Sequence, residues 1–247
     1  MTTLLLDGDQ YLYKACVALE TDVRWDDQNH MLFSNAEEAW DVFTGSLENV
    51  LEELKASKAY LAFTGSGNFR RDIYPLYKAK RGRKPLCYGT LFERAHEQFK
   101  CLHVDGLEAD DILGIWATSG RFKDSIIVSD DKDMQTLPAT LYRGGEVFKQ
   151  SKDAADAFWL FQTLTGDTTD GYSGCPGIGK VKAEKLLDEF WSGEEFHAEL
   201  AWEAVVRTYE GAGLTFDDAL TQARVARILR SSDWNEITKE VILWNPN

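Results

Sequence analysis

Short apolar runs alternate with longer amphipathic segments along this chain. We expect strands at about residues 3–6, 59–64, 125–129 and 141–143, where short, mostly apolar runs occur. Segments with apolar residues at three- and four-residue steps predict helices, at residues 36–55, 108–119, 154–164, 181–190 and 215–230. This strand–helix–strand order predicts an α/β fold with a mainly parallel central sheet flanked by helices.

The composition predicts a sizeable hydrophobic core and argues against a membrane protein and a zinc-binding protein. Of the 247 residues 44% are apolar, including eight Trp and thirteen Phe, which is ample for burial. No apolar stretch approaches the roughly 20 residues that span a bilayer, so we expect no membrane partner and a cytoplasmic location. The four Cys and four His show neither zinc-type spacing nor a common motif. Composition changes near residue 150, and we expect three regions: 1–150, 151–191 and 192–247.

Carboxylates gather in four groups, each after a predicted strand or at the start of a predicted helix. The groups are Asp7 and Asp9; Glu108, Asp110 and Asp111; Asp130, Asp131 and Asp133; and Asp167 and Asp170. With 41 acidic residues some clustering is expected by chance, and solvated side chains are the simpler explanation for any single group. Two groups directly follow strands, however, where ligand sites of α/β sheets lie. Together they predict a site for Mg²⁺ or Mn²⁺, and two such ions about 4 Å apart are the usual arrangement for phosphodiester hydrolysis.

The sign of the charge reverses between residues 70 and 84. The net charge is −14, yet this window contains seven basic residues against the single acid Asp72. They are Arg70, Arg71, Lys78, Lys80, Arg81, Arg83 and Lys84. A solvated loop is the alternative explanation, but interleaved Phe69, Tyr74 and Tyr77 favour nucleic acid, because bases stack on rings while Lys and Arg follow phosphates.

A glycine-rich stretch, residues 166–180, lies between two predicted helices. Its backbone N–H groups at the start of a helix could hold a phosphate, with Lys180 and Lys182 adding positive charge. A tight turn without DNA would need the same glycines, so this signal is only moderately specific. The stretch is not a Walker loop, because the Gly-Lys-Ser/Thr ending is absent.

Three motifs in this order carry a family resemblance: Glu-Ala-Asp-Asp at 108–111, Ser-Asp-Asp-Lys-Asp-Met at 129–134, and the glycine-rich block at 166–179. They resemble the flap endonuclease and 5′-nuclease family, and within it the 5′→3′ exonucleases of short-tailed bacteriophages, which remove primers and degrade duplex DNA from 5′ ends. The resemblance implies a PIN-like nuclease core over 1–150 with a helical arch at about 69–100. It further implies a helix-three-turn-helix DNA-binding element over 151–191 and a C-terminal helical segment, 192–247, that packs on the core.

The resemblance also implies roles for individual residues. It places Asp7, Glu108, Asp110, Asp111 and Asp131 in a first metal cluster, and Asp133, Asp167 and Asp170 in a second, for two Mg²⁺ or Mn²⁺ ions. Tyr77 would stack on the DNA end, and Lys78, assisted by Arg81, would meet the scissile phosphate. The residues implied to bind DNA are Arg70, Lys80, Arg83, Lys84, Gly174, Gly177, Gly179 and Lys180, with K⁺ at the glycine turn. The partners would be duplex or flapped DNA with 5′ ends and RNA in hybrids, in the cytoplasm of an infected bacterium.

One position departs from the family pattern. After the second strand the family places an Asp, and this chain has Gly65. The missing ligand leaves open a catalytically impaired protein that only binds DNA structures, although eight matched carboxylates favour an enzyme. A second alternative is a haloacid-dehalogenase-type phosphatase, with Asp7 as nucleophile and Asp9 as acid, which would leave the basic window and the glycine turn unexplained.

Overall fold

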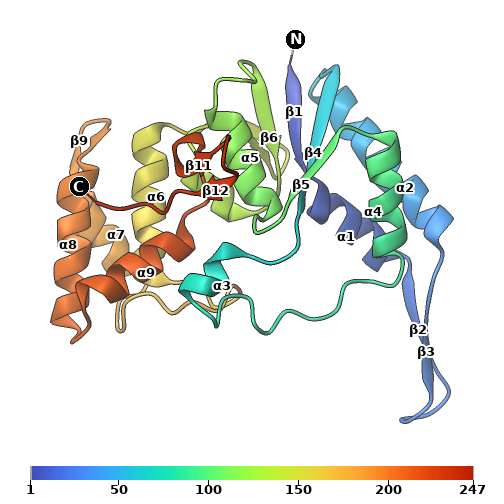
Figure 1. Ribbon diagram of the computed structural model, residues 1–247, viewed down its shortest axis with the longest axis horizontal. Coiled ribbons are helices and arrows are strands. Elements are labelled where there is room, and N and C mark those ends of the chain that lie inside the picture. Colours follow the sequence, from blue (N-terminus) through green and yellow to red (C-terminus); the bar gives the residue numbers. More distant parts are fainter. Residues whose placement is uncertain (1, 247) are drawn as a thin grey trace.

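A six-stranded sheet lies at the centre of the computed structural model, which describes residues 2–246 (Figure 1). The strands, in spatial order, are β5 (Cys101–Val104), β4 (Lys58–Thr64), β1 (Thr3–Asp7), β6 (Ser125–Val128), β7 (Thr140–Arg143) and β8 (Glu146–Lys149). All neighbouring strands are parallel except β7 and β8. The predicted α/β class and mainly parallel sheet are confirmed, whereas β5 and β8 were not predicted.

Helices cover both faces of this sheet. On one face, α1 (Gly8–Ala18), α2 (Ala36–Glu53) and α4 (Tyr88–Gln98) pack against Leu4 and Leu6 of β1. On the other face, α5 (Ala109–Thr118) packs against Leu5. Because successive strand residues point to opposite faces, a strand buried on both sides is a continuous apolar run, as in β1.

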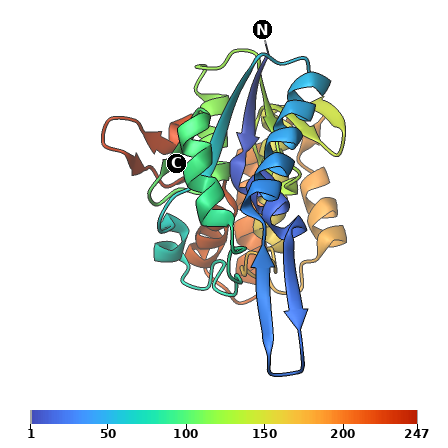
Figure 2. The same cartoon turned by 90° about the vertical axis from the view of Figure 1, so that its right-hand side faces the viewer.

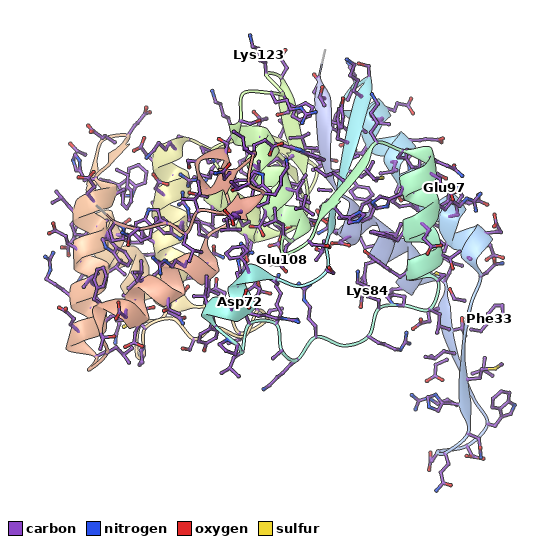
Figure 3. The ribbon with its side chains drawn as sticks, viewed as in Figure 1. Phe33, Asp72, Lys84, Glu97, Glu108 and Lys123 are labelled. Atoms are coloured by element: carbon purple, nitrogen blue, oxygen red, sulfur yellow. The ribbon has the colours of Figure 1, made fainter. Side chains whose placement is uncertain are left out.

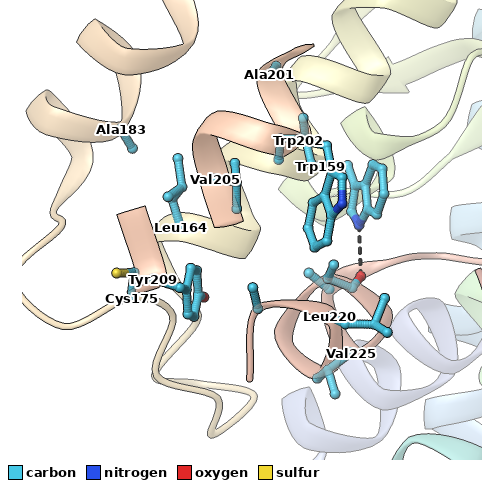
Figure 4. Packing of buried hydrophobic residues seen from close by; sticks show 14 of the residues in the cluster. Trp159, Leu164, Cys175, Ala183, Ala201, Trp202, Val205, Tyr209, Leu220 and Val225 are labelled. Atoms are coloured by element: carbon cyan, nitrogen blue, oxygen red, sulfur yellow. Dashed lines mark hydrogen bonds between the residues drawn. The ribbon is translucent and has the colours of Figure 1, made fainter. Parts of the chain in front are cut away.

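The second half of the chain is mostly helical. Its helices are α6 (Lys152–Thr165), α7 (Lys180–Asp188), α8 (Ala198–Gly211) and α9 (Phe216–Ala226), and they share one apolar cluster (Figure 4). Within it the indole N–H of Trp159 on α6 donates to the Ala223 carbonyl of α9 at 2.8 Å. The second half of the chain also contains two short β-ribbons and two 3-10 turns. The ribbons are β9 (Trp191–Ser192) with β10 (Glu195–Phe196), and β11 (Trp234–Asn235) with β12 (Glu240–Val241). The turns are η1 (Lys132–Thr136) and η2 (Ser231–Asp233).

The helix predicted for residues 215–230 is shorter than expected. It ends at Ala226, and Arg227 takes an extended conformation. The extended backbone brings the Leu229 N–H to 3.1 Å from the buried Asp111 carboxylate on α5, a contact that a continued helix would not make. Residues 227–231 therefore lie against α5.

The segment predicted as a helical arch, at about residues 69–100, is helical only towards its two ends. Only α3 (Phe69–Ile73) and α4 are helical, and residues 74–87 between them form turns and extended chain that run as an open loop below the sheet (Figure 1). Pro75 and Pro85 lack the N–H that a helix needs, and Gly82 weakens helix propensity. The basic residues of this segment therefore lie on a loop, here termed the basic loop.

A second protrusion is the hairpin of β2 (Glu20–Arg24) and β3 (His30–Ser34), which projects away from the sheet (Figure 2). None of the helices within residues 2–246 is long and apolar enough to cross a membrane.

Candidate metal centre

Three segments place carboxylates at the carboxyl end of the sheet: the end of β1, the start of η1 and the start of α5. Asp7 ends β1, caps α1 by accepting the Gln10 N–H at 3.0 Å, and accepts the Ser129 hydroxyl just beyond β6 at 3.1 Å. Asp131 caps η1 by accepting the Asp133 N–H at 2.8 Å. The start of α5 joins them, because the Ala109 N–H donates to Thr64 Oγ1 at the end of β4 at 3.1 Å.

Like charges oppose one another in the first part of this site. Burial, together with the neighbouring charges of Asp9 and Asp131, raises the pKa of Asp7 to about 7. Burial, with the charges of Asp7 and Asp131, raises the pKa of Asp110 well above its ordinary value. Among the residues that the structure describes, neither Asp7 nor Asp110 forms an ion pair, although the charge of Lys78 partly offsets the repulsion at Asp110.

Glu108, by contrast, is fully paired. Its carboxylate accepts Lys78 Nζ at 2.6 Å, the Tyr77 hydroxyl at 2.8 Å and Arg70 Nη1 at 3.4 Å. Although burial opposes ionisation, Lys78 and Arg70 lower the pKa of Glu108 to about 2. Figure 3 shows Glu108 between α5 and the start of the basic loop. Lys78 Nζ also lies 3.4 Å from Asp170, so one ammonium group joins carboxylates from two segments.

A second group joins η1 to the turn after α6. Lys132 Nζ lies 3.0 Å from Asp133 and 2.5 Å from Asp167. Burial and the charge of Asp131 raise the pKa of Asp133. The pKa of Asp167 lies below its ordinary value, because the hydrogen bond and charge of Lys132 outweigh the effect of burial. Burial raises the pKa of Asp170 despite the opposing charge of Lys78.

The donor set fits a hard divalent cation held largely through water. Across residues 2–246, no three His, Cys, Asp or Glu side chains converge closely enough to enclose an ion alone. Mg²⁺ normally keeps several waters and takes only one or two carboxylates directly. Mutually repelling carboxylates such as buried Asp7 and half-buried Asp110 are therefore suitable partners for it.

Two predicted site residues prove to be structural. Asp111 is fully buried, and its oxygens accept two hydrogen bonds from Arg70, each 2.7 Å long, and one each from the Glu108 and Leu229 N–H groups. The prediction that Asp111 ligates metal is therefore contradicted, since its oxygens are already occupied. Arg70 is only 2% exposed and also donates to the carbonyls of Val225 and Arg227, so it cannot reach DNA as predicted.

Tyr77, predicted to stack on a DNA end, is also buried. Its ring is 3% exposed and belongs to the helical cluster, while its hydroxyl donates to Glu108. In this structure the ring is not available to stack on a DNA end. The sequence places an aromatic residue here but does not show that it faces inward.

The remaining basic-loop residues lie on the surface, where Lys80 and Arg81 are exposed. Arg83 pairs with Glu20 of β2 at 2.5 Å. Lys84 Nζ lies 3.9 Å from the centre of the Tyr88 ring and 4.0 Å from Asp9 (Figure 3).

The glycine turn between α6 and α7 divides into a buried and an exposed part. Gly174 is buried, its N–H donates to Gln222 at 2.8 Å, and a Cβ there would lie 2.3 Å from the Gly166 nitrogen. The predicted phosphate contact of Gly174 is therefore wrong. Gly177, Gly179 and Lys180 are exposed and remain candidates.

Gly65 is fixed by packing. A Cβ at this position would lie 2.1 Å from the Val104 carbonyl oxygen, so this backbone admits no side chain. A carboxylate reaches the same strand end from elsewhere, because Asp9 accepts the Thr64 N–H at 2.8 Å and the Tyr88 hydroxyl. Asp9, which the motif comparison leaves outside the site, therefore lies beside the position of the missing residue.

A family model described as 5′-3′ exonuclease, N-terminal resolvase-like domain, matches residues 2–153. The chain belongs to this family of nucleases. The exodeoxyribonuclease of Enterobacteria phage T3 is 32% identical, the match covering 98% of this chain and 92% of that protein. The exonuclease of Escherichia phage T7 is also 32% identical, covering 98% and 93%. The family assignment confirms the resemblance and disfavours the phosphatase.

Solved structures share the fold at low sequence identity. The zinc-bound T5 5′-exonuclease has a TM-score of 0.63 at 15% identity, covering 92% of this chain and 93% of that one. A T5 D15 flap endonuclease complex with DNA and metal ions has a TM-score of 0.59 at 14% identity, with the same coverage. The match extends beyond residue 153 and therefore includes the helical half.

Proposed function

We propose that this nuclease uses two Mg²⁺ ions, replaceable by Mn²⁺, to hydrolyse phosphodiesters from the 5′ ends of duplex or flapped DNA. The observation that carries the proposal is the pair of carboxylates at the end of the sheet, buried Asp7 and half-buried Asp110, which repel each other and form no ion pair among the described residues. The relatives named above are exonucleases, and the T5 neighbours were crystallised with metal ions and with DNA.

Two groups of residues would hold the ions. Asp7, Asp110, Asp131 and Glu108 would contribute to the first position, and Asp133, Asp167 and Asp170 would contribute to the second. When bound, such ions supply an acidified water and stabilise charge on the phosphate oxygens. Within residues 2–246 no histidine forms a hydrogen bond with these carboxylates, so the proposal invokes no imidazole base.

The chain's own cations would bind and orient the substrate. Lys78 is held at the carboxylates by Glu108 and Asp170, where its ammonium group can meet a phosphate brought to the site. Exposed Lys80 and Arg81, with Arg83 and Lys84, would follow the strand that approaches along the basic loop. Gly177, Gly179 and Lys180 would hold a duplex phosphate at the start of α7, with K⁺ as an auxiliary ion.

The biological setting follows from the phage relatives. We place the activity in the cytoplasm of an infected bacterium, in phage DNA replication, with RNA in RNA–DNA hybrids as an additional substrate for primer removal. Catalytic impairment through Gly65 is the competing hypothesis, and it predicts DNA binding without cleavage.

The deciding experiment is a cleavage assay on blunt, 5′-overhang and flapped duplexes labelled at either end, with and without Mg²⁺. We expect short 5′ products only with metal, and loss of cleavage in Asp131→Ala and Asp167→Ala proteins that remain folded by circular dichroism. Asp130→Ala is the matched control, since Asp130 adjoins Asp131 but pairs with Lys14. Wild-type protein that binds these duplexes but releases no nucleotide with Mg²⁺ or Mn²⁺ would refute the proposal.

A further inference from the structure

The ammonium group of Lys132 lies between two carboxylates from distant parts of the chain, in the position that a metal cation would take. Its Nζ lies 3.0 Å from Asp133 Oδ1 and 2.5 Å from Asp167 Oδ2. The carboxylate side chains are only 16% and 12% exposed, whereas that of Lys132 is 51% exposed. The ammonium group thus enters from solvent between two largely buried anions.

Both carboxylates are held by contacts that do not involve Lys132. Asp133 Oδ1 accepts the Gln162 side-chain amide of α6 at 2.6 Å. Asp167 Oδ1 accepts the N–H groups of Thr169 and Asp170 at 2.7 and 3.2 Å. If the ammonium group leaves, the oxygens therefore keep their positions, and only the lysine side chain needs to move.

We propose that Lys132 is an internal counter-cation of the second carboxylate pair, and that a divalent ion must displace it to bind there. This inference rests on the proposed function, in which Asp133 and Asp167 belong to the second metal position. The ammonium group neutralises the pair in the metal-free protein and lowers the affinity of that position. Because of this competition, the second ion binds more weakly than the first.

The alternative is an ordinary ion pair that fastens η1 to the turn after α6 without affecting metal binding. The two readings differ for a neutral side chain at position 132. If the ammonium group competes with the metal, its removal strengthens binding of the second ion. If it only forms a structural ion pair, its removal makes both carboxylates more mobile and weakens binding of the second ion.

The test is a Mn²⁺ titration of DNA-free protein followed by electron paramagnetic resonance, which counts bound and free ion. Lys132→Met and Lys132→Gln remove the charge, Lys132→Arg keeps it, and Lys14→Met is the matched control. Lys14 pairs with Asp130, beside the same site, so it corrects for the general loss of one positive charge. We expect the second Mn²⁺ to bind about tenfold more tightly in both neutral variants, and within about threefold of wild type in the other two.

A second measurement uses the unmodified protein. Acetylation of Lys132 by an amine-reactive reagent, followed by mass spectrometry, should become several-fold faster when Mn²⁺ is added, while that of Lys14 stays constant. An unchanged or weaker second ion in both neutral variants, or no second ion in any protein, would overturn the inference. An unchanged or weaker second ion leaves the proposed function intact, whereas the absence of a second ion also contradicts its two-ion form. The cleavage assay on wild-type protein tests the nuclease activity itself separately.

Discussion

Replacing Arg70 tests the energetic contribution of its buried ion pair with Asp111. Arg70→Met keeps much of the side-chain volume but removes the guanidinium group that makes two 2.7 Å hydrogen bonds to Asp111. Asp111 is fully buried, so its charge would lose its only ion-pair partner among residues 2–246. The carbonyls of Val225 and Arg227 would lose a donor as well.

Removing one partner of a buried ion pair costs about 3–5 kcal/mol, and unsatisfied carbonyls add to this. We therefore expect Arg70→Met to lower the free energy of unfolding by about 4 kcal/mol. Combining it with Asp111→Leu should recover about 2 kcal/mol or more relative to the sum of the single effects, because no unpaired charge then remains.

Urea unfolding followed by circular dichroism measures these differences. Arg71→Met is the matched control, because Arg71 follows Arg70 on α3 but is exposed, and its replacement should change stability by less than about 0.5 kcal/mol. A loss below about 1 kcal/mol in Arg70→Met, or equal losses in the two variants, would refute the buried pair. A surface Arg70 that contacts DNA predicts that pattern instead.

Three further outcomes are expected. The pKa of Asp7 rises from 3.8 to about 7 on folding, so the folded state holds an extra proton between these values and metal-free stability should fall as pH rises. Mg²⁺ binding should therefore release protons near pH 6.5 in calorimetry in two buffers, and absence of release would contradict the raised pKa. Gly65→Asp should destabilise by at least about 2 kcal/mol and not raise activity, since its Cβ would lie 2.1 Å from the Val104 oxygen; a more active, stable variant would disprove this. Gly174→Ala should cost at least about 2 kcal/mol in thermal unfolding, and clearly more than Gly177→Ala, where the Cβ meets open space.

The elements that could be predicted were those whose pattern follows burial. The four strands and the helix at 36–53 were predicted because their apolar residues form the core. The β2–β3 hairpin was missed although it has an alternating pattern, since Val23, Met31 and Phe33 face solvent and indicate no core. The helix at 215–230 was overestimated because its end depends on a contact with α5 that is distant in sequence.

The candidate site shows the same division. Motif spacing predicted the acidic residues, because three short motifs in this order resemble those of the family. It could not show that Asp111 and Arg70 satisfy each other, nor that Tyr77 points inward, because the partner of a charged or aromatic side chain depends on tertiary packing. The sequence signal for Lys132 was its position in Ser-Asp-Asp-Lys-Asp-Met, between two acidic residues that were themselves the predicted ligands.

The contacts of residues 225–229 also determine when the site can form during synthesis. The ribosome releases residues 2–153, which match the family model, long before it releases Leu229. Until then Arg70 lacks two carbonyl acceptors, and Asp111, which also accepts the Glu108 N–H, lacks one N–H donor. A nascent chain therefore carries the acidic motifs without their finished support, and the nuclease site is completed only after the C-terminal helices have emerged and packed.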